Sequence, residues 1–142
     1  MKDSYMQAKE IVEQMLEKDF FSKWLGIEVV KIGEGKCVLQ MKIRPEMLNG
    51  FGIAHGGITY SLADSCLAFA SNSYGNHAVS VETSIAHLHP VRKGDVLLAK
   101  AEEISKSSKI GHYVVEVIKS SGERVAFFKG IVYIKRENWR KD

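Results

Sequence analysis

The sequence predicts a single α+β domain in which one antiparallel sheet wraps around one long helix. Three observations lead to this fold class. Apolar residues recur at helical spacing near the N-terminus and again in the middle of the chain. Two strand-like segments separate these helices, and four more follow the second helix. No internal repeat, low-complexity tract or linker divides the 142 residues, a length that suits one ordinary domain.

The first helix is predicted over about residues 4–20, where apolar side chains fall on one side. An aromatic cluster of Phe20, Phe21 and Trp24 follows it. We expect this cluster to pack in the core or at an interface, or to line a pocket for a substrate.

The next two segments, "GIEVVKIGEG" and "KCVLQMKI", alternate apolar and polar residues and are predicted to be strands joined by a glycine-containing turn. Pro45 ends the second strand. The following stretch, "RPEMLNGFGIA", is expected to be a loop with a short helical turn at its start.

The central helix is predicted over residues 56–74. Ile58, Leu62 and Cys66 lie along one helical stripe, and most remaining positions are small. Because small residues allow other backbones to come close, we expect this helix to be buried on several sides.

The second half of the chain is expected to form a four-stranded meander over about residues 77–89, 95–106, 109–119 and 123–136. A six-stranded sheet around one helix leaves an exposed edge. Pairing of two such edges would give one continuous sheet, so we expect a homodimer.

Composition excludes several classes of protein. The chain is 45% hydrophobic and 26% charged, which is typical of a soluble globular domain. Its net charge is only +3, because the basic residues are spread among almost as many acidic ones. We therefore expect no nucleic-acid partner. No stretch approaches the roughly 20 apolar residues of a membrane span, and the N-terminus lacks a signal-peptide pattern. We therefore expect a cytoplasmic location, with Cys37 and Cys66 buried and reduced.

The candidate site lies in "NGFGIAHGGITYSLADS", residues 49–65. Gly56 and Gly57 stand where the helix begins, so their N–H groups lack helical acceptors and can polarise a carbonyl oxygen. Asp64 shares the helix face of Gly57 about 10 Å further along, a separation that a partner chain or an extended substrate would have to close. In a structural interpretation, HGG is only a helix-start turn and Asp64 binds a serine. A buried acid favours a functional role, because an unpaired carboxylate is costly.

This segment resembles the active-site segment of the hotdog-fold acyl-CoA thioesterases, in the subfamily of the phenylacetate-pathway thioesterase. Asn49, His55, Gly56 and Asp64 fall at the family spacing, N-x5-H-G-G followed by L-A-D. The later stretch "VSVETSIAHLHPVRKGD" matches the family's third strand and its P-x3-GD turn. The resemblance covers about residues 20–136 and implies one hotdog domain spanning the chain: a six-stranded antiparallel sheet around a central helix, with an N-terminal helix.

The resemblance implies a role for each matching residue in hydrolysis of an acyl-CoA to a free acid and CoA. The Gly56 N–H would polarise the thioester carbonyl. Asp64 of the neighbouring subunit would act as nucleophile or as general base toward water. His55 and Asn49 would hold the thioester and the loop, and Ser80 would position water.

The family also implies a homodimer with shared active sites that assembles further into a homotetramer, and no metal or redox cofactor. Because coenzyme A carries phosphates, we expect basic residues near its entrance. The candidate substrate-binding residues are Gly57, Arg92, Lys93, Lys106 and Lys109, although "KSSKIG" departs from the family's Arg- or Gly-rich turn.

Alternative interpretations remain at this point. His87 and His89 lie two apart, a spacing that metal sites sometimes use, but no third ligand is apparent. We expect both at the sheet face or at a subunit contact. Two other functions are a hotdog-fold 3-hydroxyacyl-thioester dehydratase or hydratase and a non-catalytic acyl-CoA-binding module. The acyl group itself, aryl or fatty, is not specified by the sequence.

Overall fold

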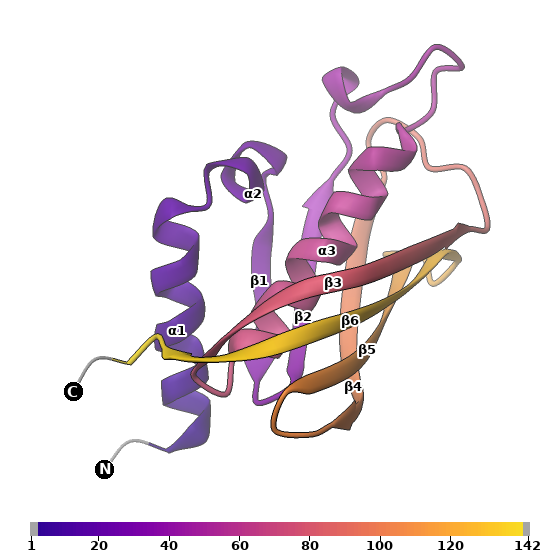
Figure 1. The fold of residues 1–142 in the computed structure, drawn as a ribbon. Coiled ribbons are helices and arrows are strands. Elements are labelled where there is room, and N and C mark those ends of the chain that lie inside the picture. Colours follow the sequence, from indigo (N-terminus) through magenta and orange to yellow (C-terminus); the bar gives the residue numbers. More distant parts are fainter. Residues whose placement is uncertain (1–2, 141–142) are drawn as a thin grey trace.

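The computed structural model describes residues 3–140 and has the predicted α+β architecture, a sheet curved around one helix (Figure 1). The helices are α1 (Ser4–Lys18), α2 (Phe20–Leu25) and α3 (Gly56–Asn72), and a 3-10 helix η1 covers Pro45–Met47. The strands are β1 (Glu28–Gly33), β2 (Lys36–Lys42), β3 (Asn76–His87), β4 (Val96–Lys106), β5 (Ile110–Lys119) and β6 (Arg124–Asn138). Within residues 3–140, no helix combines the length and the apolar character needed to cross a membrane.

The sheet is antiparallel throughout, in the order β1-β2-β4-β5-β6-β3. The predicted four-stranded meander is therefore wrong in one respect. Strands β4, β5 and β6 follow one another, but β3 pairs with β6 and β4 pairs with β2. Apolar alternation predicts that a segment is a strand but does not say which strand it pairs with. The consequence is that β3 and β1 form the two edges of the sheet.

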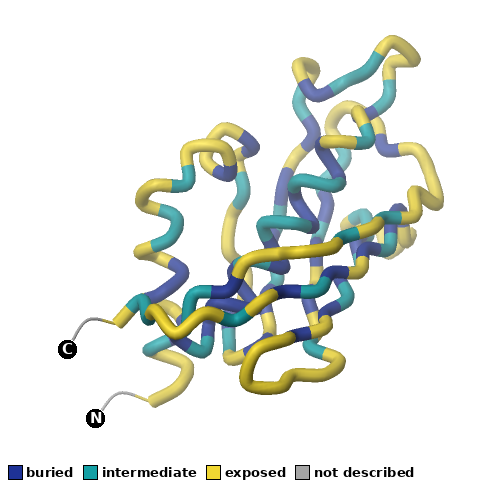
Figure 2. Tube along the Cα trace, viewed as in Figure 1, coloured by how far each residue is buried: buried dark blue, intermediate teal, exposed yellow. Residues whose placement is uncertain are grey.

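Helix α3 packs on the sheet and forms the centre of the hydrophobic core. Its residues Leu62 and Leu67 are almost completely buried, and most of the helix is dark or teal in Figure 2. Gly130 of β6 lies where the helix comes close: a Cβ there would be 2.6 Å from Cδ2 of Leu67. Cys37 and Cys66 are buried and free, as predicted.

The N-terminal helical segment is two helices rather than one. The Asp19 carboxylate accepts hydrogen bonds from the Ser22 N–H (3.0 Å) and the Ser22 hydroxyl (2.7 Å), which caps the start of α2. The Ser22 hydroxyl also bonds to the Ser65 hydroxyl of α3 at 2.8 Å. These contacts attach α2 to α3.

The aromatic cluster on α2 is exposed within this chain, so it does not pack in the core. Phe20 is 74% exposed, and about half of Phe21 and of Trp24 is accessible. The rings of Phe21 and Trp24 stack with their centroids 6.1 Å apart. An interface or a pocket remains as the predicted role for this cluster.

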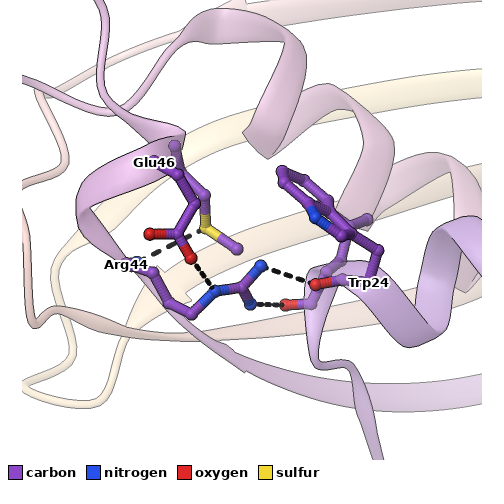
Figure 3. A network of polar contacts seen from close by, with 5 residues as sticks. Trp24, Arg44 and Glu46 are labelled. Carbon is purple, nitrogen blue, oxygen red and sulfur yellow. Dashed lines mark hydrogen bonds and ion pairs between the residues drawn. The ribbon is translucent and has the colours of Figure 1, made fainter.

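Arg44 joins α2 to the loop that leads to α3 (Figure 3). Its guanidinium donates to the carbonyl oxygens of Trp24 (2.6 Å) and Leu25 (2.9 Å) and pairs with Glu46 (2.5 Å). Both carbonyls belong to the end of α2, where the helix itself offers no donor. Arg44 therefore anchors the start of the loop over residues 44–55, which ends just before α3 begins at Gly56.

Strand β3 is an exposed edge. Residues 79–82 are all exposed, and Val81 is 61% accessible. Val81 is also the extra residue of a bulge, because Ser80 pairs with Val132 and Glu82 with Ile131. The bulge reverses the alternation of side chains along the strand, so that Ser80 and later odd-numbered residues face α3.

Candidate active site

The start of α3 leaves one backbone donor open. An α-helix begins with four N–H groups that have no acceptor within the helix. Here the His55 N–H bonds to the Met47 carbonyl (2.8 Å), the Gly57 N–H to Nδ1 of His55 (2.9 Å), and the Ile58 N–H to the His55 carbonyl (2.9 Å). Among residues 3–140, the Gly56 N–H has no hydrogen-bond acceptor. The prediction of two open glycine donors is therefore correct only for Gly56.

His55 and Asn49 are both held by the backbone around them. Nδ1 of His55 accepts a hydrogen bond, so the proton of the neutral ring lies on Nε2, and this side chain is exposed. The side-chain oxygen of Asn49 accepts from the N–H groups of Phe51 (2.9 Å) and Ile53 (3.4 Å). The Asn49 amide nitrogen is therefore the polar atom of that side chain left for another partner.

A cavity of about 370 Å³ opens at this end of α3. Its wall includes Asn49 from the loop, Gly56 and Thr59 from the helix, and His87 from the end of β3. Nε2 of His87 lies 3.1 Å from the position that a Cβ on Gly56 would occupy. The imidazole thus lies against the helix start, and a larger residue at position 56 would press on it.

Asp64 lies two turns further along α3 and is half-buried without a partner. Its carboxylate has no hydrogen bond or ion pair to any residue from 3 to 140. Burial raises its pKa above the usual range for an aspartate. The serines beside it are engaged elsewhere: the Ser61 hydroxyl donates to the Gly57 carbonyl (2.7 Å), and the Ser65 hydroxyl bonds to Ser22. Among residues 3–140, Asp64 therefore binds no serine, as the structural interpretation would require.

A second cavity, of about 260 Å³, contains Asp64 and Ser80. Its remaining wall is apolar or small, with Leu67, Ala68 and Val132 among the lining residues. The fold thus brings together two of the predicted site residues, one from α3 and one from β3.

The two cavities lie at different positions along the same helix. The Tyr60 and Thr83 hydroxyls are hydrogen-bonded between α3 and β3, and the Tyr60 ring packs edge-on against Phe128 with centroids 5.3 Å apart. Gly56 and Asp64 are separated by about 12 Å along the helix axis, at 1.5 Å per residue. A chain's own Asp64 is therefore far from its own Gly56 N–H.

The basic residues predicted to bind phosphates fall into two groups. Arg92 and Lys93 lie in the loop after β3, next to the cavity that contains Gly56. Lys106 lies at the end of β4, with Nζ 4.6 Å from the Tyr74 ring centroid just beyond α3, and Lys109 is in the adjoining turn. Within one chain these four residues do not form a single cluster.

The two predicted histidines line the same cavity as Gly56 but belong to different segments. His87 is the last residue of β3 and faces α3, whereas His89 follows in the loop. Over residues 3–140, no three His, Cys, Asp or Glu side chains are arranged to hold a metal ion. The sequence placed His87 at the sheet face or at a subunit contact and did not predict its contact with Gly56, because the bulge at Val81 is not visible in the apolar pattern.

The sequence profile of the Thioesterase superfamily matches residues 51–126, which include His55, Gly56, Asp64 and Ser80. Acyl-coenzyme A thioesterase PaaI of Escherichia coli is 38% identical over 124 residues, covering 87% of this chain and 89% of the relative. Acyl-coenzyme A thioesterase 13 of Homo sapiens is 28% identical over 122 residues, covering 83% and 87%. The structure of the Escherichia coli PaaI protein superimposes with a TM-score of 0.94 at 33% identity, covering 96% of this chain and 99% of that chain.

Proposed function

This chain belongs to the thioesterase superfamily and has its hotdog fold, and from that premise we propose that it hydrolyses acyl-CoA thioesters to a free acid and CoA. The observation that carries the proposal is that two groups on one helix, the Gly56 N–H and the Asp64 carboxylate, have no partner among residues 3–140. A donor for developing negative charge and a base or nucleophile are the two groups that hydrolysis of a thioester needs.

The Gly56 end binds the thioester carbonyl. Its oxygen accepts a hydrogen bond from the Gly56 N–H, and the positive end of the helix dipole adds to the attraction. As the carbonyl carbon is attacked, negative charge moves onto this oxygen and the hydrogen bond strengthens. The amide nitrogen of Asn49 and Nε2 of His55 are the side-chain donors that hold the thioester in place.

Asp64 supplies the attack. As a general base it takes a proton from a water held by Ser80, the water oxygen attacks the carbonyl carbon, and the C–S bond breaks to release the CoA thiolate. As a nucleophile its carboxylate attacks the same carbon and displaces the thiolate, and water then cleaves the anhydride. The raised pKa of Asp64 favours either role, because a carboxylate of higher pKa is a stronger base.

Two copies of the chain share each site. We place the dimer interface at the β3 edge, where Val79 and Val81 expose apolar surface and the strand offers unpaired backbone groups. Antiparallel pairing of two β3 strands about a two-fold axis places the Asp64 end of one subunit beside the Gly56 end of the other. The same two-fold axis brings Lys106 of one subunit toward Arg92 of the other. We expect the CoA phosphates to bind between these basic residues. A further association of two dimers gives the proposed tetramer.

The proposal is tested by measuring free thiol released from a panel of aryl and fatty acyl-CoAs. We expect turnover by the wild-type chain, and Asp64→Asn should lower kcat by about 10²–10⁴-fold because the base or nucleophile is lost. Glu102→Gln, an exposed acid on β4, is the matched control and should leave kcat unchanged.

One outcome would contradict the role of Asp64, and two others would contradict the function. Wild-type activity in Asp64→Asn removes the proposed role of the carboxylate. Hydration of crotonyl-CoA without thiol release would indicate a hydratase. Acyl-CoA that stabilises the protein but is recovered intact would indicate a binding module.

A further inference from the structure

We propose that His87 is a further catalytic residue, whose ring N–H donates a hydrogen bond to the thioester oxygen beside the Gly56 N–H. This inference rests on the proposed acyl-CoA hydrolysis. It adds a strand residue to a donor site otherwise built from the helix start and the loop before it.

The register of β3 directs His87 toward α3. Thr83 pairs with Gly130 and Ile85 with Phe128, and both of these partners face the side of the sheet that α3 covers. His87 continues this inward series and pairs with Ala126, a small and fully buried residue. The last inward side chain of the edge strand therefore lies over the first residue of α3.

The polar edge of the ring is turned to the helix. From the position of a Cβ on Gly56, Nε2 of His87 is 3.1 Å away and Cε1 is 3.5 Å, whereas Cδ2 is 3.9 Å. Gly56 and His87 line the same cavity. A carbonyl oxygen that accepts from the Gly56 N–H thus lies in a space that the imidazole also borders.

The ring of His87 has an N–H that no residue from 3 to 140 accepts. No residue from 3 to 140 forms a hydrogen bond with its ring, and we place the single N–H of the neutral imidazole on Nε2, the nitrogen that lies nearest Gly56. The other helix-start donors are not available, because the Gly57 N–H is bound to His55 and the Ile58 N–H to a carbonyl. Oxyanions of acyl transfer are commonly held by two or more donors, and His87 is the strand residue placed to supply one.

The test compares two substitutions of His87 with a histidine on the opposite face of the sheet. His87→Phe keeps a ring of similar size but removes the N–H, and His87→Gln retains an N–H at similar reach. His112→Phe is the control, since His112 is exposed and lies beside the buried, inward-facing Tyr113 on β5. The wild-type side chain at position 87 is exposed, so both variants should fold, and thermal unfolding checks this.

We expect His87→Phe to lower kcat by about 10²-fold with KM changed less than about threefold, because the lost bond strengthens only in the transition state. His87→Gln should recover at least about a tenth of the wild-type kcat, and His112→Phe should match wild type. A wild-type chain that hydrolyses acyl-CoA while His87→Phe retains full kcat overturns this inference alone. The same holds if His87→Gln is no better than His87→Phe. Absence of thiol release by the wild-type chain overturns the proposed function together with it.

Discussion

Asn72 and Asp64 are two polar side chains on the same helix, and the fold treats them in opposite ways. Asn72 is 2% exposed and fully bonded. Its amide nitrogen donates to the carbonyls of Ala68 (2.8 Å) and Ala78 (3.0 Å), and its oxygen accepts from the Ala78 N–H (2.9 Å) and Nε1 of Trp139 (2.8 Å). Asp64, two turns earlier, has no partner among residues 3–140, and burial raises its pKa. The polar group that holds the end of α3 is saturated, whereas the carboxylate beside the exposed β3 edge is the group for which we propose a catalytic role.

The largest effect on stability should follow from removing the saturated group. Asn72→Ala leaves the Ala78 N–H and Nε1 of Trp139 without acceptors, which we expect to lower the free energy of unfolding by about 2–4 kcal/mol. Urea unfolding measures this change. The control is Ser71→Ala at the neighbouring position, which removes only one long hydrogen bond of 3.3 Å. It should lower the free energy of unfolding by less than about 1 kcal/mol. Equal stability of Asn72→Ala and wild type would show that the Asn72 contacts do not hold the end of α3.

Asp64→Asn should slightly raise the stability of the protein, whereas Asn72→Ala lowers it. Because burial raises the folded-state pKa, the folded chain binds more protons than the unfolded chain between the ordinary pKa and the raised one. Wild-type stability therefore falls as the pH rises through that window, and the amide variant escapes this loss. We expect Asp64→Asn to raise Tm by about 1–4 °C at pH 7, with the difference vanishing below about pH 4. A lower Tm for this variant at neutral pH would mean that the carboxylate stabilises the fold.

The contrast between the two residues also shows what the sequence could predict. Helical spacing alone placed the helix-start glycines and Asp64 on one helix, because an α-helix has a fixed period, whereas their proposed roles came from the family resemblance. The six strands were found from alternation and turn residues. Their pairing order was not, since β3 joins β6 through contacts that local pattern does not encode.

Two further features needed the structure for a physical reason. The division of the N-terminal helix at Asp19 depends on side-chain hydrogen bonds to Ser22, which compete with continuation of the helix. The inward orientation of both Ser80 and His87 depends on the bulge at Val81. Strict alternation would put these two residues on opposite faces, so the sequence pattern alone does not bring them to one side of the sheet.

The central claim is that Asp64 of one subunit serves Gly56 of the other, and mixed dimers test it most directly. Gly56→Pro removes the N–H while fitting the first helical position, and the extended backbone of His55 (φ −58°, ψ 138°) suits a residue before proline. Gly56→Ala is its control, because it adds the same Cβ beside His87 but keeps the N–H.

Asp64→Asn and Gly56→Pro should each be nearly inactive alone. When their subunits are mixed, each heterodimer contains one intact site, formed by Gly56 of the first variant and Asp64 of the second. Random mixing makes half of the dimers heterodimers, so the mixture should recover about a quarter of wild-type activity. Activity no greater than the sum of the two separate variants would contradict the shared site and assign both groups to one chain.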